Sequence, residues 1–370
     1  MYVVNSNLRD PAFFSRYCKR NFLRNIISSS RISVEDLLKI GCKIGRRSIL
    51  IPTTDEDAVF VAENASLLKE WFIFPNQNAE LVRSLCNKMK MHYLAKRFKI
   101  PTAEAIFPLS RQDATDFLKT ASFPIVLKVI DGWRLKASIE RNVIVHTERE
   151  LLEKYEFMQD PVEPNLMLQE YIPGEDDTVW MFNGYFNERS DCLVGFSGKK
   201  IRQWPLHRGL TSLGICSKNE CLEKVTKDFM RAINYKGILD VGYRFDSRDG
   251  RYKVLDVNPR VGATFRLFVS NTQMDVVRAL YLDMTGQPII AGVAEDGRKW
   301  LVEDIDWASS LCSHSNGSLS LKNWSDSYRG VREAAYFAHD DPLPFVKVWM
   351  NKVANFHSVF RELRSHTAEA

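Results

Sequence analysis

Three polar side chains at the end of one predicted strand could together hold a metal ion and a phosphate chain. Residues 237–260 have the pattern of two strands joined by a tight turn, and they end in Asp256-Val-Asn258-Pro-Arg260. Because residues two apart on a strand point to the same face, these side chains project side by side. Mg²⁺ prefers oxygen ligands and usually takes one or two protein carboxylates, with water and phosphate oxygens as the rest. The pattern predicts a magnesium–polyphosphate site with Asp256 and Asn258 as metal ligands and Asp240, on the partner strand, as the third.

A purely structural explanation of Asp256 is that it begins the turn before Pro259. Aspartate between two apolar residues of a strand is disfavoured by β-propensity, which favours a functional role for Asp256. Asp246 and Asp249 lie in the turn between the two strands and are explained more simply as turn formers.

A lysine within an apolar run is the second candidate. Lys128 lies in Phe-Pro-Ile-Val-Leu-Lys-Val-Ile over residues 123–130, which predicts a strand. A lysine in this position either contacts an anion or lies on a sheet edge, where it prevents aggregation. Lys88, in a lysine-rich helix expected over residues 79–98, is by itself explained as a solvated surface residue.

A backbone edge followed by carboxylates could bind a nucleoside. Residues 166–172 predict a strand, Pro173-Gly174 a turn, and residues 178–182 a second strand. A purine can hydrogen-bond to such an edge and an aspartate can take ribose hydroxyls. An ordinary acidic hairpin turn explains the same pattern. The residues concerned are Gln169, Glu170, Tyr171 and Ile172 on the edge and Glu175, Asp176 and Asp177 after the turn.

A basic segment over residues 197–209 predicts a loop that contacts an anion. Nucleic-acid surfaces can mix basic and aromatic residues in this way, but one short loop in a chain with 51 basic and 46 acidic residues is too little for such an interface. A phosphate or carboxylate contact is therefore favoured. Arg260 and Arg266 could also bind a carboxylate in a bidentate manner, although surface exposure explains Arg266 equally well. The basic residues of the loop are Lys199, Lys200, Arg202, His207 and Arg208.

Composition limits the class of protein. With 370 residues and 45% hydrophobic content, the chain is long enough for two or three globular units. The net charge of +5 is a mild excess, and the seven cysteines include no Cys-x-x-Cys pair. Apolar runs of transmembrane length, signal-peptide patterns and P-loop, dinucleotide-binding and serine-hydrolase motifs are missing. We therefore expect a cytoplasmic protein with no disulfide framework, zinc site, membrane partner or nucleic-acid partner.

The other segments alternate short strands with helices, which is typical of an α/β protein. A strand is expected over residues 47–52, and Thr53, Thr54 or Asp55 could cap the helix that follows to residue 71. The further predicted elements are a return strand over 143–145, helices over 151–158, 220–234 and 274–284, and an amphipathic C-terminal helix.

Four pieces, taken in order, resemble the ATP-grasp superfamily, and most closely its carboxylate–amine ligases, over roughly residues 80–290. Each piece alone is a weak signal, whereas four in the right order and spacing are specific. The pieces are Asn87-Lys88 ahead of Lys99-Ile-Pro-Thr102, Phe123-Pro-Ile-Val-Leu-Lys128, Leu168-Gln-Glu-Tyr-Ile-Pro-Gly174, and residues 237–260.

The resemblance implies an α/β protein of ATP-grasp fold, with α+β lobes that hold ATP behind an N-terminal α/β pre-ATP-grasp domain. The implied domains are residues 1–80 (N-terminal), 81–165 (small lobe), 166–290 (large lobe with the metal site) and 291–370 (extension of the large lobe). The implied cofactors are ATP and Mg²⁺, with Mn²⁺ as a possible substitute. The resemblance implies that Lys88 and Lys128 bind the nucleotide, with Lys128 reaching the phosphates. The other implied roles are adenine binding for Glu170 and Ile172, ribose binding for Asp176 or Asp177, metal binding for Asp256 and Asn258, and stabilisation of the transferring group or the acyl phosphate for Arg260.

Two departures from the family pattern concern the metal and the phosphates. The family often has an acidic metal ligand where this chain has Gly242, and Asp240, two residues earlier, could replace it. The loop that covers the phosphates is usually glycine-rich, whereas here Arg134 and Lys136 could supply charge. The N-terminal domain also looks short, so either a late start or a trimmed domain is expected.

The resemblance implies a ligase that forms an amide or peptide bond through an acyl phosphate and releases ADP and phosphate, with Arg260 and Lys128 as its catalytic residues. Its substrates would be small acids and amines, such as amino acids or short peptides, and a homodimer is possible. A biotin-carboxylase-like carboxylase and a catalytically weak ATP-binding regulator are the alternatives. His207 is a poor candidate for a general base.

Overall fold

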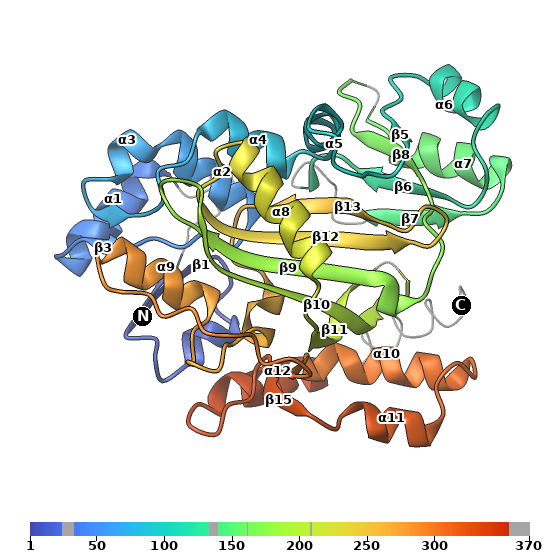
Figure 1. Ribbon diagram of the computed structural model, residues 1–370. Helices are drawn as coiled ribbons and strands as arrows, with labels where there is room; N and C mark the ends of the chain where they lie inside the picture. The colour runs from blue at the N-terminus through green and yellow to red at the C-terminus, as the bar shows by residue number, and fades with distance from the viewer. Residues whose placement is uncertain (24–32, 133–139, 161, 208, 355–370) are drawn as a thin grey trace.

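Two sheets of unequal size form the frame of the protein in the computed structural model, which describes residues 1–23, 33–132, 140–160, 162–207 and 209–354. Figure 1 shows the large sheet crossing the middle of the molecule, with the small sheet beside one end and the N-terminal helices beside the other. None of the helices in these ranges has the length and apolarity needed to cross a membrane. A cytoplasmic location stays a prediction.

The large sheet has the strand order β13-β12-β9-β10-β11-β14-β15. One face packs against α8 (Glu220–Ala232) through an apolar cluster that includes Leu239, Val241 and Tyr243. The opposite face packs partly against α9 (Val276–Met284) and the 3-10 helix η4 (Ala263–Leu267). The strands are β9 (Val179–Phe186), β10 (Cys192–Trp204), β11 (Leu210–Cys216), β12 (Gly237–Asp246), β13 (Arg251–Asn258), β14 (Lys299–Leu301) and β15 (Val331–Ala334).

The small sheet has the order β5-β8-β6-β7 and is covered on one face by α6 (Arg111–Leu118) and α7 (Glu148–Met158). Along β6, Ile125, Leu127 and Val129 enter the apolar core, whereas Lys128 lies on the opposite face because side chains alternate along a strand. The strands are β5 (Ala105–Ile106), β6 (Ile125–Val129), β7 (Asn142–Val145) and β8 (Leu166–Glu170).

The N-terminal region contains two separate parallel strand pairs instead of one larger sheet. β1 (Tyr2–Asn5) pairs with β2 (Arg20–Leu23), and β3 (Ser48–Ile49) pairs with β4 (Phe72–Ile73). Thr54 caps α2, its side chain accepting a hydrogen bond from the backbone N–H of Asp57. The helices are η1 (Pro11–Phe14), α1 (Val34–Ile44), α2 (Asp55–Glu63), α3 (Ala65–Leu68), α4 (Ala79–Cys86) and α5 (Lys88–Arg97).

The C-terminal region forms a layer below the large sheet in the view of Figure 1, with α10 (Glu303–Ser315), α11 (Leu321–Ser327) and α12 (Leu343–Ala354). It also holds the N-terminal segment. The buried carboxylate of Asp341 accepts hydrogen bonds from the Ser15 hydroxyl, at 2.5 Å, and from the backbone N–H of Arg16, at 3.0 Å. The two ends of the described chain are therefore tied together.

Two helices that the sequence predicted as continuous are interrupted. The helix expected over residues 79–98 is split into α4 and α5 at Asn87, whose backbone is extended and whose side chain caps α5 through the N–H of Lys90. Asn64 likewise separates α2 from α3 within the expected helix over residues 55–71. The Asn87 side chain replaces a backbone hydrogen bond at a helix start, whereas the Asn64 side-chain amide donates to the carbonyl of Phe60 at the end of α2, at 2.8 Å.

Two predicted connections were wrong. The strands expected over residues 166–172 and 178–182 form no hairpin: β8 pairs with β5 and β6 in the small sheet, whereas β9 pairs with β10 and β12 in the large sheet. Residues 171–178 therefore link the two sheets. Most of the basic loop expected over residues 197–209 is in fact strand β10, which pairs with β9 and β11 on its two sides.

Candidate active site

Two carboxylates and an amide come together where β12 begins and β13 ends. The antiparallel register places Asp240 opposite Asn258 and Gly242 opposite Asp256. The Asn258 amide nitrogen donates to Asp256 Oδ2, at 2.9 Å, and to Asp240 Oδ2, at 3.4 Å. Asn183 on β9 donates to the other oxygen of Asp240, at 2.9 Å. The structure thus brings together the three residues that the sequence proposed as metal ligands.

The electrostatics of this group suit a divalent cation. Desolvation and the nearby charge of Asp256 raise the pKa of Asp240 to about 6, so the site disfavours two bare carboxylates. A bound cation would remove that penalty. Across the part of the chain that the structure describes, no group of three or more His, Cys, Asp and Glu side chains is arranged to hold a metal. A metal here would therefore take two carboxylates, an amide, water and phosphate oxygens, which suits Mg²⁺.

An acidic side chain in place of Gly242, where the family often has one, would require the Asp256 carboxylate to move. A Cβ atom on Gly242 would lie against Oδ1 of Asp256. Any larger side chain at this position would displace Asp256 from its present place. Asp240 is therefore the carboxylate that accompanies Asp256.

Two lysines, one from each sheet, approach these carboxylates. Desolvation and the charge of Lys88 lower the pKa of Lys128 to about 8, while the negative charge of Asp256 opposes the change. Desolvation likewise lowers the pKa of Lys200 to about 8, against the charges of Asp256, Asp176 and Asp240. We call Asp240, Asp256, Asn258, Lys128 and Lys200 the charged cluster.

The position of β6 in the small sheet excludes the explanation of Lys128 as a sheet-edge residue. β6 is an inner strand that pairs with β7 on one side and β8 on the other, so Lys128 does not lie on a sheet edge. Lys88 is the first residue of α5, and its backbone N–H donates to the carbonyl of Ile130 just after β6. The α5 N-terminus is therefore held beside the strand that carries Lys128.

Glu170 anchors the segment between the sheets. Its carboxylate accepts hydrogen bonds from Arg248, at 3.0 Å, and Lys253, at 3.3 Å. Despite desolvation, the backbone N–H of Glu104 and these two cations lower the pKa of Glu170. The buried Asp246 binds the same two cations. Asp246 is thus more than a turn former, and the Glu170 side chain is occupied by these contacts.

The residues next to Glu170 in the chain are buried or contact Arg244 instead of Arg248 and Lys253. Gln169 and Ile172 are buried, and the Tyr171 ring lies 5.2 Å from the guanidinium of Arg244. Arg244 was not identified from the sequence. The signal that could have found it is its spacing, because Asp240, Gly242 and Arg244 alternate onto one face of β12.

The two aspartates after the turn differ in environment. Asp176, in the 3-10 helix η3 (Asp176–Thr178), accepts a hydrogen bond from the Gln203 amide at 2.6 Å, and desolvation raises its pKa. Asp177 is exposed and lies 4.0 Å from Lys199. The negative charge of Asp176 also acts on Lys200, where it opposes the lowering of the lysine pKa.

Arg260 connects the cluster to the N-terminal region. Its Nε donates to Asp55 at the start of α2, at 2.9 Å, and its Nη1 lies 3.5 Å from Asp240 Oδ2. Arg266 lies apart and pairs with Glu333 of β15. Arg134, Lys136 and Arg208 lie outside the described residues.

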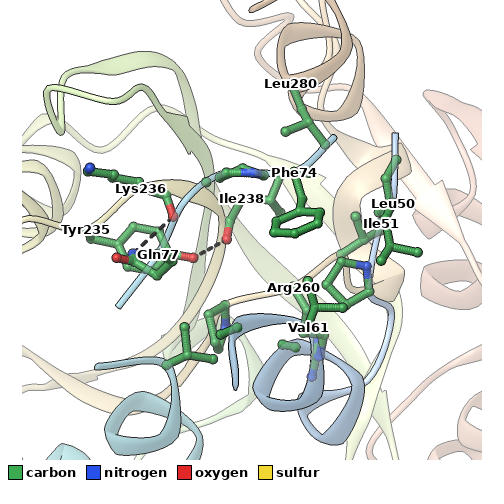
Figure 2. Close-up of a pocket in the computed structure, with 18 residues that line it drawn as sticks. Leu50, Ile51, Val61, Phe74, Gln77, Tyr235, Lys236, Ile238, Arg260 and Leu280 are labelled. Carbon is green, nitrogen blue, oxygen red and sulfur yellow. Dashed lines mark hydrogen bonds between the residues drawn. The ribbon is translucent and has the colours of Figure 1, made fainter. Parts of the chain in front are cut away.

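Two pockets adjoin Arg260 and the residues after it. Figure 2 shows the first, a mostly apolar cavity of about 60 Å³ between the N-terminal region and the large sheet, where Arg260 lies among Leu50, Ile51 and Val61. The second, of about 560 Å³, begins at Val261 and Gly262 and extends to Trp300 and Tyr336. We call it the η4 pocket. A Cβ atom on Gly262 would lie 2.8 Å from Asp240 Oδ2, so the η4 pocket is next to the charged cluster.

Comparisons with known proteins find ligases and synthases of low sequence identity. No protein-family model matches the chain. The chain is 22% identical over 243 residues to D-aspartate ligase of Enterococcus faecium. The aligned region is 63% of this chain and 58% of that protein. It is 24% identical over 213 residues to the carbamoyl phosphate synthase large chain of Clostridium acetobutylicum, or 54% of this chain and 19% of that protein. The chain thus spans little more than half of the first relative and a fifth of the second.

Solved structures show the same fold at low identity. The biotin carboxylase–ATP complex from Campylobacter jejuni matches 80% of this chain and 74% of its own, with a TM-score of 0.61 and 13% identity. N5-carboxyaminoimidazole synthetase of Staphylococcus aureus with ADP matches 85% and 79%, with a TM-score of 0.59 and 12% identity. The chain has the ATP-grasp fold, as the sequence predicted. The expectation of an enzyme agrees with the names of these relatives.

Arg202 is held away from the charged cluster, in a buried ion pair. Its guanidinium donates to both oxygens of Asp306 on α10, at 3.0 and 2.7 Å, and lies over the Tyr328 ring. The register of β10 against β11 shifts on both sides of Arg202. Such irregularities re-aim a side chain. We therefore leave Arg202 out of the proposed site.

Replacement of Arg202 should affect stability rather than ligand binding. Arg202→Met leaves the carboxylate of Asp306, which is 1% exposed, without its cation; removal of one partner of a buried pair typically costs about 3–5 kcal/mol. We expect a clearly lower midpoint of thermal unfolding. The double variant Arg202→Met/Asp306→Leu should recover much of the loss. An unchanged midpoint with weakened nucleotide binding would contradict this role.

Proposed function

We propose that the protein is an ATP-dependent ligase that joins a carboxylate to an amine through an acyl phosphate, with release of ADP and phosphate. The observation that carries the proposal is the charged cluster, in which Lys128 from the small sheet lies close to Asp256, and Lys200 from the large sheet lies close to both Asp256 and Asp240. Desolvated charges of both signs in one place are typical of functional sites. The lysines would bind a triphosphate and the carboxylates would hold a cation beside it, which accounts for the presence of charges of both signs.

Each part of the cluster has a role in this proposal. Asp256, Asn258 and Asp240 would hold Mg²⁺, or Mn²⁺ in its place, and the ion would neutralise charge on the phosphates. Lys128 and Lys200 bind the phosphate chain and keep its terminal phosphate in place for in-line attack by the substrate carboxylate. Arg260 stabilises the phosphate as it is transferred. Positioning and electrostatics do most of the catalysis, and no general base is assigned.

Residues 170–178, which lead from the small sheet to the large sheet and are called the linking segment, would hold the nucleoside. Contacts of Glu170 with Arg248 and Lys253 fix the segment against the end of the hairpin at which the turn joins β12 to β13. This leaves the backbone at residues 170–172, rather than the Glu170 carboxylate, to contact adenine. Asp176, which is less exposed than Asp177 and is close to Lys200, is the better candidate for the ribose hydroxyls.

The η4 pocket would take the acid or amine substrate. It adjoins the cluster at Gly262 and, at about 560 Å³, has room for an amino acid or a short peptide. Valine and aromatic side chains line much of it, while Asp275 and the Arg266–Glu333 pair supply polar groups. The name of the relative D-aspartate ligase is consistent with an amino-acid substrate.

The experiment that tests the proposal is ADP release from ATP and Mg²⁺ in the presence of pools of amino acids, with bicarbonate as a separate arm. Release that requires both an acid and an amine supports the ligase and identifies its substrates. Release that requires bicarbonate but no amino acid would support the carboxylase instead. Tight ATP binding without release in any arm would support a regulatory protein, the alternative that the loss of an acidic residue at Gly242 favours.

Asp256→Ala should reduce ADP release at least roughly 100-fold, because it removes the charge that the metal and both lysines share. The matched control is Asp249→Ala, since Asp249 lies in the turn of the same hairpin and its side chain contacts Lys253, at 3.5 Å, and the backbone N–H of Arg251, at 3.1 Å. The control should release ADP at close to the wild-type rate. Near-wild-type release by Asp256→Ala would refute the metal assignment.

Val277→Trp should fill the η4 pocket and raise the KM of the acid or amine roughly tenfold or more, with the KM of ATP unchanged. Steady-state kinetics with the substrates found above measure the two constants separately. Val162→Trp is the control, because Val162 is 91% exposed and lies elsewhere in the chain. An equal rise in both constants, or in neither, would remove the pocket from the proposal.

A further inference from the structure

Arg244 is a buried cation with an unused hydrogen-bond donor. Only 7% of the residue is exposed, and its Nη2 donates to the carbonyl of Gly174 in the linking segment. Its Nε is buried and has no hydrogen-bond partner among the described residues. A buried donor without a partner typically costs about 1–3 kcal/mol, and most such groups in native proteins have an explanation.

The charges around Arg244 are also unfavourable for a buried cation. Arg244 lies close enough to Lys128 and Lys200 to lower the pKa of both lysines. Within the described ranges, no carboxylate forms an ion pair with it at 4.0 Å or less, and Asp176 is the acidic residue whose pKa it lowers. Three cations in one desolvated region repel one another, and a multiply charged anion would relieve that repulsion.

The position of Arg244 indicates which anion would bind beside it. Alternation along β12 places it on the same face as Asp240, with Gly242 between them. At its other end, the guanidinium contacts Tyr171 and Gly174 of the linking segment. A nucleotide with its base at residues 170–172 and its terminal phosphates at Asp256 must pass this side chain.

We propose that Arg244 binds the phosphate chain of the nucleotide between the linking segment and the metal ligands. The inference rests on the proposed function, because it requires a nucleotide in this place. Its guanidinium supplies a fixed positive charge beside Gly242, the position at which the expected acidic metal ligand is missing. A role limited to holding Gly174 in place is the competing explanation.

The test compares the binding of ATP, ADP and adenosine by calorimetry, with and without Mg²⁺. Arg244→Met should weaken ATP binding roughly 10- to 100-fold, as expected for lost charge-assisted hydrogen bonds, and should weaken adenosine binding little. Arg244→Lys should recover part of the ATP affinity because it restores the charge. Arg251→Met, an exposed cation on the same hairpin, is the control and should bind all three ligands as the wild type does.

The outcomes separate the two proposals. If the wild type binds ATP and Arg244→Met binds it equally well, the inference about Arg244 fails and the proposed function stands. Equal losses of ATP and adenosine affinity would show that Arg244 only positions the linking segment, which also overturns the inference. If the wild type binds no adenine nucleotide, the proposed function fails, and the inference fails with it. Adenosine binding by each variant also shows that the variant is folded.

Discussion

The antiparallel register of β12 on β13 is the constraint on which the charged cluster depends. It sets Asp240 opposite Asn258 and thereby brings two carboxylates to one amide. A slip by one residue would turn Asp256 to the other face of the sheet. That slip is prevented by packing, since Leu239, Val241 and Tyr243 alternate with the polar residues of β12 and are buried against α8. The apolar core on one face of the hairpin thus determines where the polar side chains of the other face lie.

The charges that this register collects are unfavourable without a ligand. Asp240 has a raised pKa, and Lys128 and Lys200 have lowered ones, so desolvation opposes the charged form of each group. Such a site costs stability, which the rest of the fold must offset, and it recovers that free energy when ions of both signs bind. A polyphosphate with its divalent cation is a ligand of that description.

Alternation along single strands explains what the sequence could predict. Asp256, Asn258 and Asp240 were found because a period of two needs no knowledge of the partner strands. The same period places Lys128 opposite the small-sheet core, although its apolar neighbours hide the pattern, and only the strand order shows that β6 is not at an edge. For local geometry of this kind, one sequence was sufficient.

The features that the sequence missed depend on pairing between distant segments. A strand, a Pro-Gly turn and a second strand look like a hairpin, but β8 and β9 find their partners in different sheets. Arg202 stands two residues from Lys200 in the sequence, and its separation from the cluster follows from irregular pairing with β11 and from a buried partner, Asp306, on α10. Neither the irregularity nor the partner leaves a mark in the local sequence.

Arg260 shows that the site is built from more than the two sheets. Its Nε is taken by Asp55, which stands at the start of α2, and its Nη1 is near Asp240. The chain after it must pass close to both groups, and Gly262 permits this because a Cβ there would lie 2.8 Å from Asp240 and 2.9 Å from Arg260. The direction of the guanidinium is therefore set by the N-terminal region. A displacement of α2 would move Arg260 relative to the carboxylates, so the N-terminal region is a structural part of the site.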